Sequence, residues 1–157
     1  MGSAREQIPE IPVAAVMTAR LVTVAANASL AEARDLLHQH GIHHLLVMHE
    51  QRVVAVLSDR DVLRSVSPYV GTLSEQTRDM RSLLRPVFQV ATYHPITVPP
   101  EASVLEAAAL MLDHSISCLP VVDTPGDTVG VVTSRDLLRG VLACALPRQD
   151  DSAAPAA

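Results

Sequence analysis

Two short stretches of this chain decide how the whole is built: Leu57-Ser58-Asp59-Arg60-Asp61-Val62-Leu63 and Val132-Thr133-Ser134-Arg135-Asp136-Leu137-Leu138. In each, a β-branched apolar run ends at a hydroxyl residue, Arg-Asp follows, and apolar residues then return at a spacing typical of a helix. The second stretch lies 75 residues after the first. Such similarity at a fixed separation indicates an internal duplication.

The duplication extends outward from these stretches. Residues 12–49 lie over residues 86–123 with 15 identities in 38 positions, at a separation of 74 residues. After that the separation becomes 75 residues, because the second copy has one extra residue in a loop. The sequence therefore predicts two copies of one folding unit with a connecting segment and two ends. The expected boundaries are an arm at 1–11, the copies at 12–66 and 86–146, a linker at 67–85 and a disordered tail at 147–157.

Both copies predict the same order of elements, β-α-β-β-α. In each copy a short extended stretch precedes Ser-x-x-Glu, a capping box that begins a helix after Ser29 and after Ser103. Two β-branched runs follow the helix, and the stretches quoted above begin the last helix. The helices of one copy can cover one face of its strands, so the other face needs the second copy as a partner. The strands are expected at 21–24, 45–48 and 53–57, and at 95–98, 119–122 and 129–132.

Two further predictions concern helices. The first helix of the second copy is apolar around its circumference, so we expect it to be more buried than its counterpart. The linker predicts a helix within 74–84 that ends before Pro86, with Met80, Leu83 and Leu84 on one side.

The composition narrows the class of protein. Of the 157 residues, 48% are hydrophobic, which excludes wholesale disorder because such a chain can bury enough surface to offset its ordering entropy. No uncharged apolar run is long enough to span a membrane, and two cysteines are too few for a disulfide scaffold. The net charge of −5 and the 2% aromatic content argue against a nucleic-acid partner. No secretory signal begins the chain, so we expect a cytoplasmic protein.

The ordered set of motifs resembles a tandem pair of cystathionine β-synthase (CBS) domains, the arrangement called a Bateman module. The resemblance rests on Val16-Met17-Thr18, on Gly41-Ile42-His43-His44-Leu45-Leu46-Val47 with its counterpart at 115–122, and on the two stretches quoted first. The sequence departs from the family pattern at Leu46, where proline is frequent, and at Ala91, where methionine is usual. The resemblance implies an α/β (α+β) fold, in which two β-α-β-β-α repeats pack with pseudo-two-fold symmetry.

The same resemblance implies a regulatory sensor, not an enzyme, that needs no cofactor. Many CBS pairs bind an adenosine-type ligand (AMP, ADP, ATP or S-adenosylmethionine) in two clefts between the repeats. The family commonly forms homodimers, and the output would pass to an unknown effector protein or through the dimer. One cleft is expected to combine Thr18, Val22, Thr23, Ile42, His43 and His44 with Thr133, Arg135 and Asp136. The other is expected to combine Thr92, Ile96, Thr97, Ile116, Ser117 and Cys118 with Ser58, Arg60 and Asp61.

The chemistry of the repeated motif agrees with this interpretation. An ionised carboxylate accepts two hydrogen bonds, which suits the neighbouring hydroxyls of a ribose. Each motif lies at a helix start, where free N–H groups and the helix dipole favour anions such as phosphate. Arg60 and Arg135 add donors that fit phosphate oxygens in a bidentate manner. The first cleft is the better equipped for an anion, because it also gathers His43 and His44.

Three alternatives stay open at this point. Ser-x-x-Asp is also an ordinary helix cap, so the chain can be a structural dimerisation module with empty clefts. The histidines at 38, 40, 43, 44 and 49 suggest a metal sensor, although no carboxylate or cysteine joins them at helical spacing. Cys118 and Cys144 suggest a redox sensor, although two buried thiols that pack as small apolar groups are the simpler interpretation.

Overall fold

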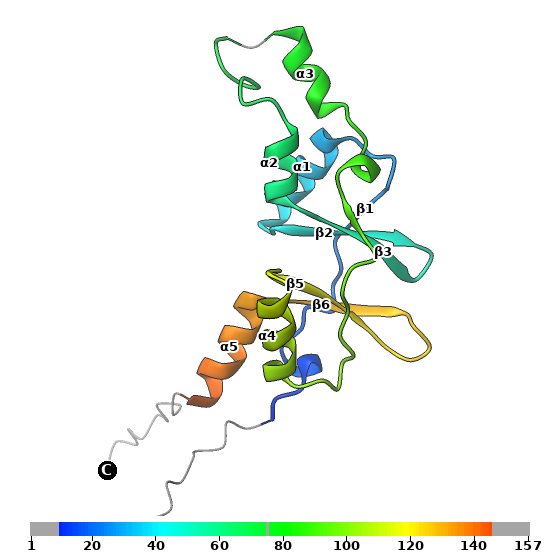
Figure 1. Cartoon of the computed structure of the whole chain (residues 1–157), viewed down its shortest axis with the longest axis vertical. Helices are drawn as coiled ribbons and strands as arrows, with labels where there is room; N and C mark the ends of the chain where they lie inside the picture. The colour runs from blue at the N-terminus through cyan, green and yellow to red at the C-terminus, as the bar shows by residue number, and fades with distance from the viewer. Residues whose placement is uncertain (1–9, 75, 146–157) are drawn as a thin grey trace, which may run out of the picture.

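The computed structural model describes residues 10–74 and 76–145, with side-chain burial described as far as residue 143. The tail predicted for 147–157 lies outside the described residues, as do most of the predicted arm and the side chain of Cys144. None of the helices in the described part is long and apolar enough to cross a membrane. Two similar units, repeat 1 and repeat 2, lie one above the other along the long axis of the molecule (Figure 1).

Repeat 1 has the predicted order of elements. They are β1 (Thr23–Val24), α1 (Leu30–His40), β2 (His44–His49), β3 (Arg52–Ser58) and α2 (Asp59–Ser65). The predicted capping box begins α1: Glu32 N donates to Ser29 Oγ at 3.2 Å, and Ser29 N donates to Glu32 Oε2 at 2.8 Å. Gly41 ends α1 with φ of 60°, a left-handed conformation that glycine adopts without a steric penalty.

Repeat 2 has the same order, with its first strand reduced to a single bridge between Val98 and Val121. Its elements are α4 (Val104–Asp113), β5 (Cys118–Val122), β6 (Thr128–Thr133) and α5 (Ser134–Ala145). The extended stretches expected at 21–24 and 95–98 therefore form shorter strands than predicted. The reason is that the residues just before each strand line the space between the repeats instead of joining a sheet.

Each repeat lends its leading segment to the sheet of the other. Strand β4 (Thr92–Tyr93) comes from the beginning of repeat 2, yet it pairs antiparallel with β3 of repeat 1. The matching residue of repeat 1, Thr18, forms an antiparallel bridge with Val131 in β6. Thr18 N donates to Val131 O at 2.9 Å, and Val131 N donates to Thr18 O at 3.0 Å. The exchange is reciprocal, as the pseudo-two-fold arrangement requires.

The exchanged segments also enter the two hydrophobic cores. Short 3-10 helices form at η1 (Val13–Ala15) and η2 (Val87–Gln89). Val13 is fully buried in the core of repeat 2, and Val87 is fully buried in the core of repeat 1. Because each core contains a valine from the other copy, separating the repeats would open both cores.

One packing detail explains the departure at Ala91. Met17 lies against Gly130 so closely that a Cβ on the glycine would be 2.6 Å from Met17 Sδ and 3.2 Å from Thr18 O. At the equivalent places Ala55 of repeat 1 stands for Gly130, and Ala91 of the leading segment of repeat 2 stands for Met17. Ala91 packs against the core that includes Ala55. In one of the two equivalent contacts a large residue, Met17, thus meets a glycine. In the other contact a small residue, Ala91, meets an alanine.

The two sheets meet in the middle of the molecule, and each repeat's own helices cover the outer face of its sheet (Figure 1). Side chains alternate accordingly along β2: Leu45 and Val47 belong to the core under α1 and α2. Leu46 points the other way, toward repeat 2, and is 1% exposed. Leu46, which stands where the family frequently has proline, therefore fills space between the repeats.

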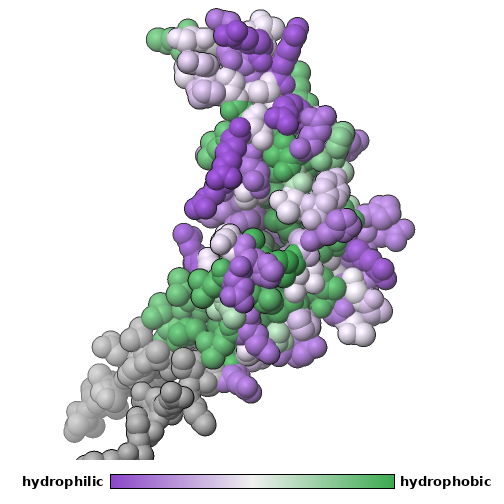
Figure 2. All heavy atoms as spheres, viewed as in Figure 1, coloured by the Kyte–Doolittle hydropathy of each residue, from purple (hydrophilic) through white to green (hydrophobic). Residues whose placement is uncertain are grey.

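The apolar character of α4 does not make it the more buried helix, so that prediction is wrong. Helix α4 buries Val104, Ala107 and Met111, while α1 buries residues at the three equivalent positions. The extra apolar residues of repeat 2 remain exposed, and Figure 2 shows hydrophobic surface gathered over α4 and α5. We call the exposed set the leucine face; it consists of Leu105, Leu112, Leu138 and Leu142.

The linker contains the expected helix, α3 (Thr77–Leu83), but a different side of it is buried. Of the three residues predicted to share one side, Leu83 is buried and Met80 and Leu84 are exposed, while Asp79 takes an inner position. The Ser67 hydroxyl donates to Asp79 Oδ1 at 2.7 Å, and Gln76 N donates to Asp79 Oδ2 at 2.9 Å. These hydrogen bonds hold the pKa of Asp79 below its ordinary value of 3.8, and the bond from Ser67 contributes most. Asp79 thereby ties α3 to the end of α2.

Candidate functional site

A groove of about 1090 Å³ lies between the two repeats. The leading segments, the loops that follow α1 and α4, and the first turns of α2 and α5 all contribute to its walls. Residues predicted for both clefts line this one groove, and we call the parts around Asp136 and around Asp61 its two halves. The predicted residues that line it are Thr18, Val22, Ile42, His43, His44, Ser58, Arg60, Asp61, Thr92, Ile96, Ile116, Ser117, Cys118, Thr133, Arg135 and Asp136.

Two predicted residues, Thr23 and Thr97, do not line the groove. They occupy equivalent positions, and both side chains are exposed. Each stands next to a residue whose side chain is buried, Val24 or Val98. Because neighbouring side chains of a strand point to opposite faces, burial of the valine turns the threonine outward.

The two Ser/Thr-x-x-Asp motifs form matching capping boxes on the groove wall. In repeat 1, Ser58 N and Ser58 Oγ donate to Asp61 Oδ2 at 3.0 and 2.5 Å. In repeat 2, Thr133 N and Thr133 Oγ1 donate to Asp136 Oδ2 at 2.9 and 2.6 Å. In both boxes Oδ2 of the carboxylate serves the helix start, and Oδ1 takes no part in the cap. The cap and a ligand therefore need not compete for the same atom.

Four arginines line the groove, two inside the motifs and two just after them. Arg60 and Arg135 were predicted from the sequence, while Arg64 and Arg139 were missed. The signal for the missed pair was present, because an arginine stands three residues after each aspartate in both copies. Residues three apart share one helix face, and Arg139 Nη1 lies 3.8 Å from Asp136 Oδ1. Each half of the groove thus has a carboxylate beside two guanidinium groups.

His43 makes a contact that sequence reasoning also missed. Its Nδ1 lies 2.7 Å from Asp59 Oδ2, and Asp59 N donates to the His43 carbonyl at 2.9 Å. The carboxylate partner comes from the start of α2, 16 residues away, so helical spacing could not reveal it. Repeat 2 keeps the backbone bond, from Ser134 N to Ser117 O at 3.1 Å, but has two serines where repeat 1 has the hydrogen-bonded His43 and Asp59.

His44 lines the groove and contacts the opposite repeat. Its Nε2 is 3.3 Å from Ser117 Oγ of repeat 2. Burial lowers the pKa of His44 below its ordinary value of 6.5, although the Asp59 and Asp61 carboxylates oppose the shift. His44 is therefore largely neutral at pH 7 and can accept as well as donate a hydrogen bond.

Cys118 is equivalent to His44 and behaves as an inert thiol. It is 7% exposed, and burial, assisted by the Asp136 carboxylate, raises its pKa to about 12. A thiol with that pKa holds almost no thiolate near pH 7, so it is a poor nucleophile and a poor redox centre. Among the residues that the structure describes, no three His, Cys, Asp or Glu side chains converge as metal ligands would.

The model of the CBS domain matches the chain twice, at residues 13–68 and 87–143. The chain belongs to the CBS domain family. Both matches coincide with the repeats described above, so the molecule is a CBS pair. Proteins of this kind are generally regulatory and non-catalytic.

Curated relatives of this CBS pair include short and long proteins. It is 32% identical over 122 residues to the CBS domain-containing protein YhcV of Bacillus subtilis, covering 77% of this chain and 79% of the relative. It is 34% identical over 117 residues to an inosine-5'-monophosphate dehydrogenase of Korarchaeum cryptofilum, covering 74% of this chain. The chain spans only 21% of that enzyme, so the likeness concerns one part of a larger protein.

Solved structures show the same fold. A CBS domain protein from Pyrobaculum aerophilum complexed with AMP superposes with a TM-score of 0.69 at 29% identity, covering 85% of this chain and 96% of that one. The CBS domain pair of protein MJ0100, in complex with 5'-methylthioadenosine and S-adenosyl-L-methionine, gives a TM-score of 0.69 at 25% identity, covering 83% and 95%. The predicted fold of two packed β-α-β-β-α repeats is therefore confirmed.

Proposed function

We propose that this CBS pair is a sensor that binds an adenine nucleotide or related adenosyl ligand in the inter-repeat groove. One observation carries the proposal: Asp61 and Asp136 stand at helix starts on the groove wall, and in each the cap engages Oδ2 and leaves Oδ1 outside the cap. A ribose presents two neighbouring hydroxyls, and the remaining carboxylate oxygen can accept from them. Related CBS pairs that hold AMP or adenosyl compounds support the assignment.

The rest of the groove suits the other parts of such a ligand. Val22 and Ile42 in one half, and Ile96 and Ile116 in the other, are partly buried apolar side chains between which a purine can lie. The first turns of α2 and α5 offer helix N-termini beside paired arginines, an environment that favours phosphate. We assign the phosphates to these turns, and His43 to the wall of the groove, since its Nδ1 is held by Asp59.

We infer a regulatory role without catalysis, in which ligand binding is linked to the arrangement of the two repeats. A ligand that touches both repeats favours the arrangement to which it binds more tightly, by its difference in affinity. Because each core contains a valine from the leading segment of the other repeat, a change in that arrangement affects both cores. The signal would pass to an effector protein or through a homodimer, and the cytoplasm stays our prediction for where this happens.

The leucine face supports the homodimer. Leu112 is 80% exposed and Leu138 is 64% exposed, on neighbouring helices of repeat 2. A contiguous apolar face on a small protein marks an interaction surface. We propose that a second copy covers it through the same face, because a two-fold contact buries both copies of a self-complementary surface and leaves none exposed.

Unfolding measured with and without ligand tests the proposed function. A ligand present at 100 times its dissociation constant should add about 2.7 kcal/mol to the free energy of unfolding. We expect such a gain with AMP, ATP or S-adenosylmethionine, and its loss in the double variant Asp61→Ala, Asp136→Ala. Asp113→Ala, an exposed carboxylate outside the groove, is the matched control. If none of the three ligands stabilises the protein, the structural dimerisation module becomes the better account.

A further inference from the structure

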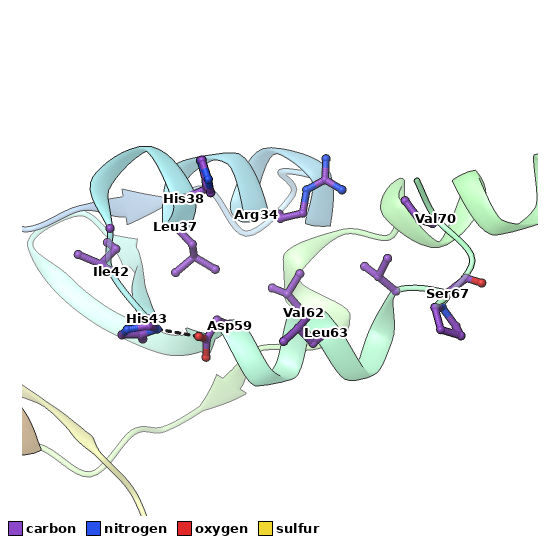
Figure 3. Close-up of a pocket in the computed structure, with 13 residues that line it drawn as sticks. Arg34, Leu37, His38, Ile42, His43, Asp59, Val62, Leu63, Ser67 and Val70 are labelled. Atoms are coloured by element: carbon purple, nitrogen blue, oxygen red, sulfur yellow. Dashed lines mark hydrogen bonds and ion pairs between the residues drawn. The ribbon is translucent and has the colours of Figure 1, made fainter. Parts of the chain in front are cut away.

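Repeat 1 has a second cavity, separate from the body of the groove, that the proposed function does not use. It has a volume of about 650 Å³ and lies between α1 and α2 on the outer side of the repeat. Figure 3 shows Leu37 of α1 and Val62 of α2 pointing toward each other across it. The segment that follows α2, with Pro68 and Val70, closes one end, and we call this space the outer cavity.

The surroundings of the outer cavity differ between the repeats in side chains and in backbone. Val62 corresponds to the larger Leu137, and Leu37 corresponds to the longer and more flexible Met111. Leu137 and Met111 are both buried in the core of repeat 2. Helix α2 ends at Ser65, and the segment with Pro68 and Val70 that follows it lines the cavity, whereas α5 continues to Ala145.

The size and lining of the outer cavity match those of small-molecule sites. Such sites enclose roughly 300–1,000 Å³ and combine a mostly apolar lining with a few polar groups at fixed places. Here the floor is apolar, and the polar groups stand at the edges: Arg34 and His38 on α1, and the His43–Asp59 pair at one end.

The charges at the edge indicate what kind of ligand fits. Among the described residues that line the cavity, Asp59 is the one carboxylate, and it already accepts from His43 at 2.7 Å. Arg34 has only a 3.4 Å contact with the exposed Asp35, and an exposed pair of that kind is weak. Hydrogen-bond donors therefore exceed acceptors around an apolar space, so a fitting ligand brings an apolar body and an anionic acceptor.

We propose that the outer cavity binds a small amphipathic carboxylate, with its apolar body between α1 and α2 and its carboxylate toward Arg34. The proposal does not rest on nucleotide binding in the groove. The proposed ligand would nevertheless lie beside the groove, because both spaces share four lining residues: Gly41, Ile42, His43 and Asp59. A ligand in the outer cavity would touch the same loop that forms one wall of the groove.

Titration calorimetry with octanoate, in the absence of any nucleotide, tests the proposal. We expect saturable binding of one octanoate per chain and a weaker interaction with octanol, which has the same body without the charge. The double variant Val62→Leu, Val66→Leu enlarges two residues that line the cavity and should abolish the binding by filling the space. Leu138→Gln removes apolar surface from the leucine face instead, and should leave octanoate binding unchanged.

A second variant keeps the test decisive if the filled variant is unstable. Arg34→Gln changes an exposed residue and should weaken octanoate about tenfold, as expected for loss of a charged hydrogen-bond partner, without affecting octanol. No octanoate binding to the unmodified protein would overturn the proposal. So would binding that survives the filling substitutions or that Leu138→Gln removes, and equal affinity for octanoate and octanol would refute the role of Arg34. Loss of nucleotide binding in a separate experiment would leave these outcomes untouched.

Discussion

The two repeats of this CBS pair share a fold but present different surfaces. Their cores, capping boxes and Ser/Thr-x-x-Asp motifs agree position by position. Their outer helical faces do not: the leucine face of repeat 2 corresponds in repeat 1 to Ala31, His38, Leu63 and Ser67. The loop that follows the first helix differs too, with His43, His44 and Asp59 in repeat 1 where repeat 2 has Ser117, Cys118 and Ser134. Duplication has kept what the unit needs to fold and has let the exposed positions diverge toward separate tasks.

The largest expected effect concerns the exchanged segments. Gly130→Ala places a Cβ where Met17 and the Thr18 carbonyl now lie, so the free energy of unfolding should fall by about 2 kcal/mol, as overpacking typically causes. Adding Met17→Ala recreates the equivalent combination of Ala55 with Ala91 and should recover part of the loss. Urea unfolding of the two single variants and the double variant gives the interaction energy. Strict additivity would show that the two sites do not press on each other.

The next effect separates the two helical faces. Leu138→Gln should weaken the homodimer at least about tenfold, because a buried leucine contributes well over the 1.4 kcal/mol that a tenfold change requires. Leu63→Gln makes the same change at the equivalent position of repeat 1 and should leave the dimer intact. Sedimentation equilibrium of both variants measures the difference. A dimer that responds equally to both substitutions would mean that both faces take part.

A smaller effect compares the two halves of the groove. The half that we assign to Asp136 also has His43 and His44, so it should hold an anionic nucleotide more tightly than the half assigned to Asp61. Asp136→Ala should therefore weaken AMP binding by more than Asp61→Ala, each measured by titration calorimetry. The reverse order, or two equal losses, would contradict this assignment of residues to the halves.

The smallest effect is the pH response of His44. Its pKa in the folded protein is below 6.5, so as the pH falls below 6.5 the unfolded chain takes up a proton before the folded chain does. Stability should then decline in acid relative to the variant His44→Asn, and the difference should be constant above pH 7.5. Cys118→Ala is the matched control, since a thiol with a pKa of about 12 stays protonated throughout that range. Parallel stability curves for the protein and His44→Asn between pH 5 and 8 would exclude the effect.

Much of this structure could be predicted from the sequence, because the duplication presents each sequence pattern twice. The capping boxes at Ser29 and Ser103 place two helix starts, and the continuous apolar runs that begin at Leu45 and Leu119 place strands. The order of elements and most residues that line the groove could be predicted for that reason. Features that occur in only one repeat were harder to interpret, as the exposed leucines of α4 show. An apolar helix indicates that one of its faces needs to be covered, but it does not indicate which chain covers that face.

Contacts between distant segments could not be predicted. The exchange of leading segments puts Val13 into the core of repeat 2, and nothing local in the sequence says which core a short apolar segment joins. The ion pair between His43 and Asp59 depends on a loop meeting a helix start, 16 residues along the chain. The burial of Asp79 on α3 depends on Ser67, which reaches it from the end of α2. Each is set by tertiary packing, which residue spacing does not encode.

A crystal structure of this CBS pair with AMP tests the central claim most directly. We expect the ribose hydroxyls within hydrogen-bonding distance of the Asp61 or Asp136 carboxylate, the purine between the paired apolar side chains of the groove, and the phosphate at the first turn of α2 or α5. AMP bound elsewhere, or a groove that stays empty at saturating AMP, would contradict the account.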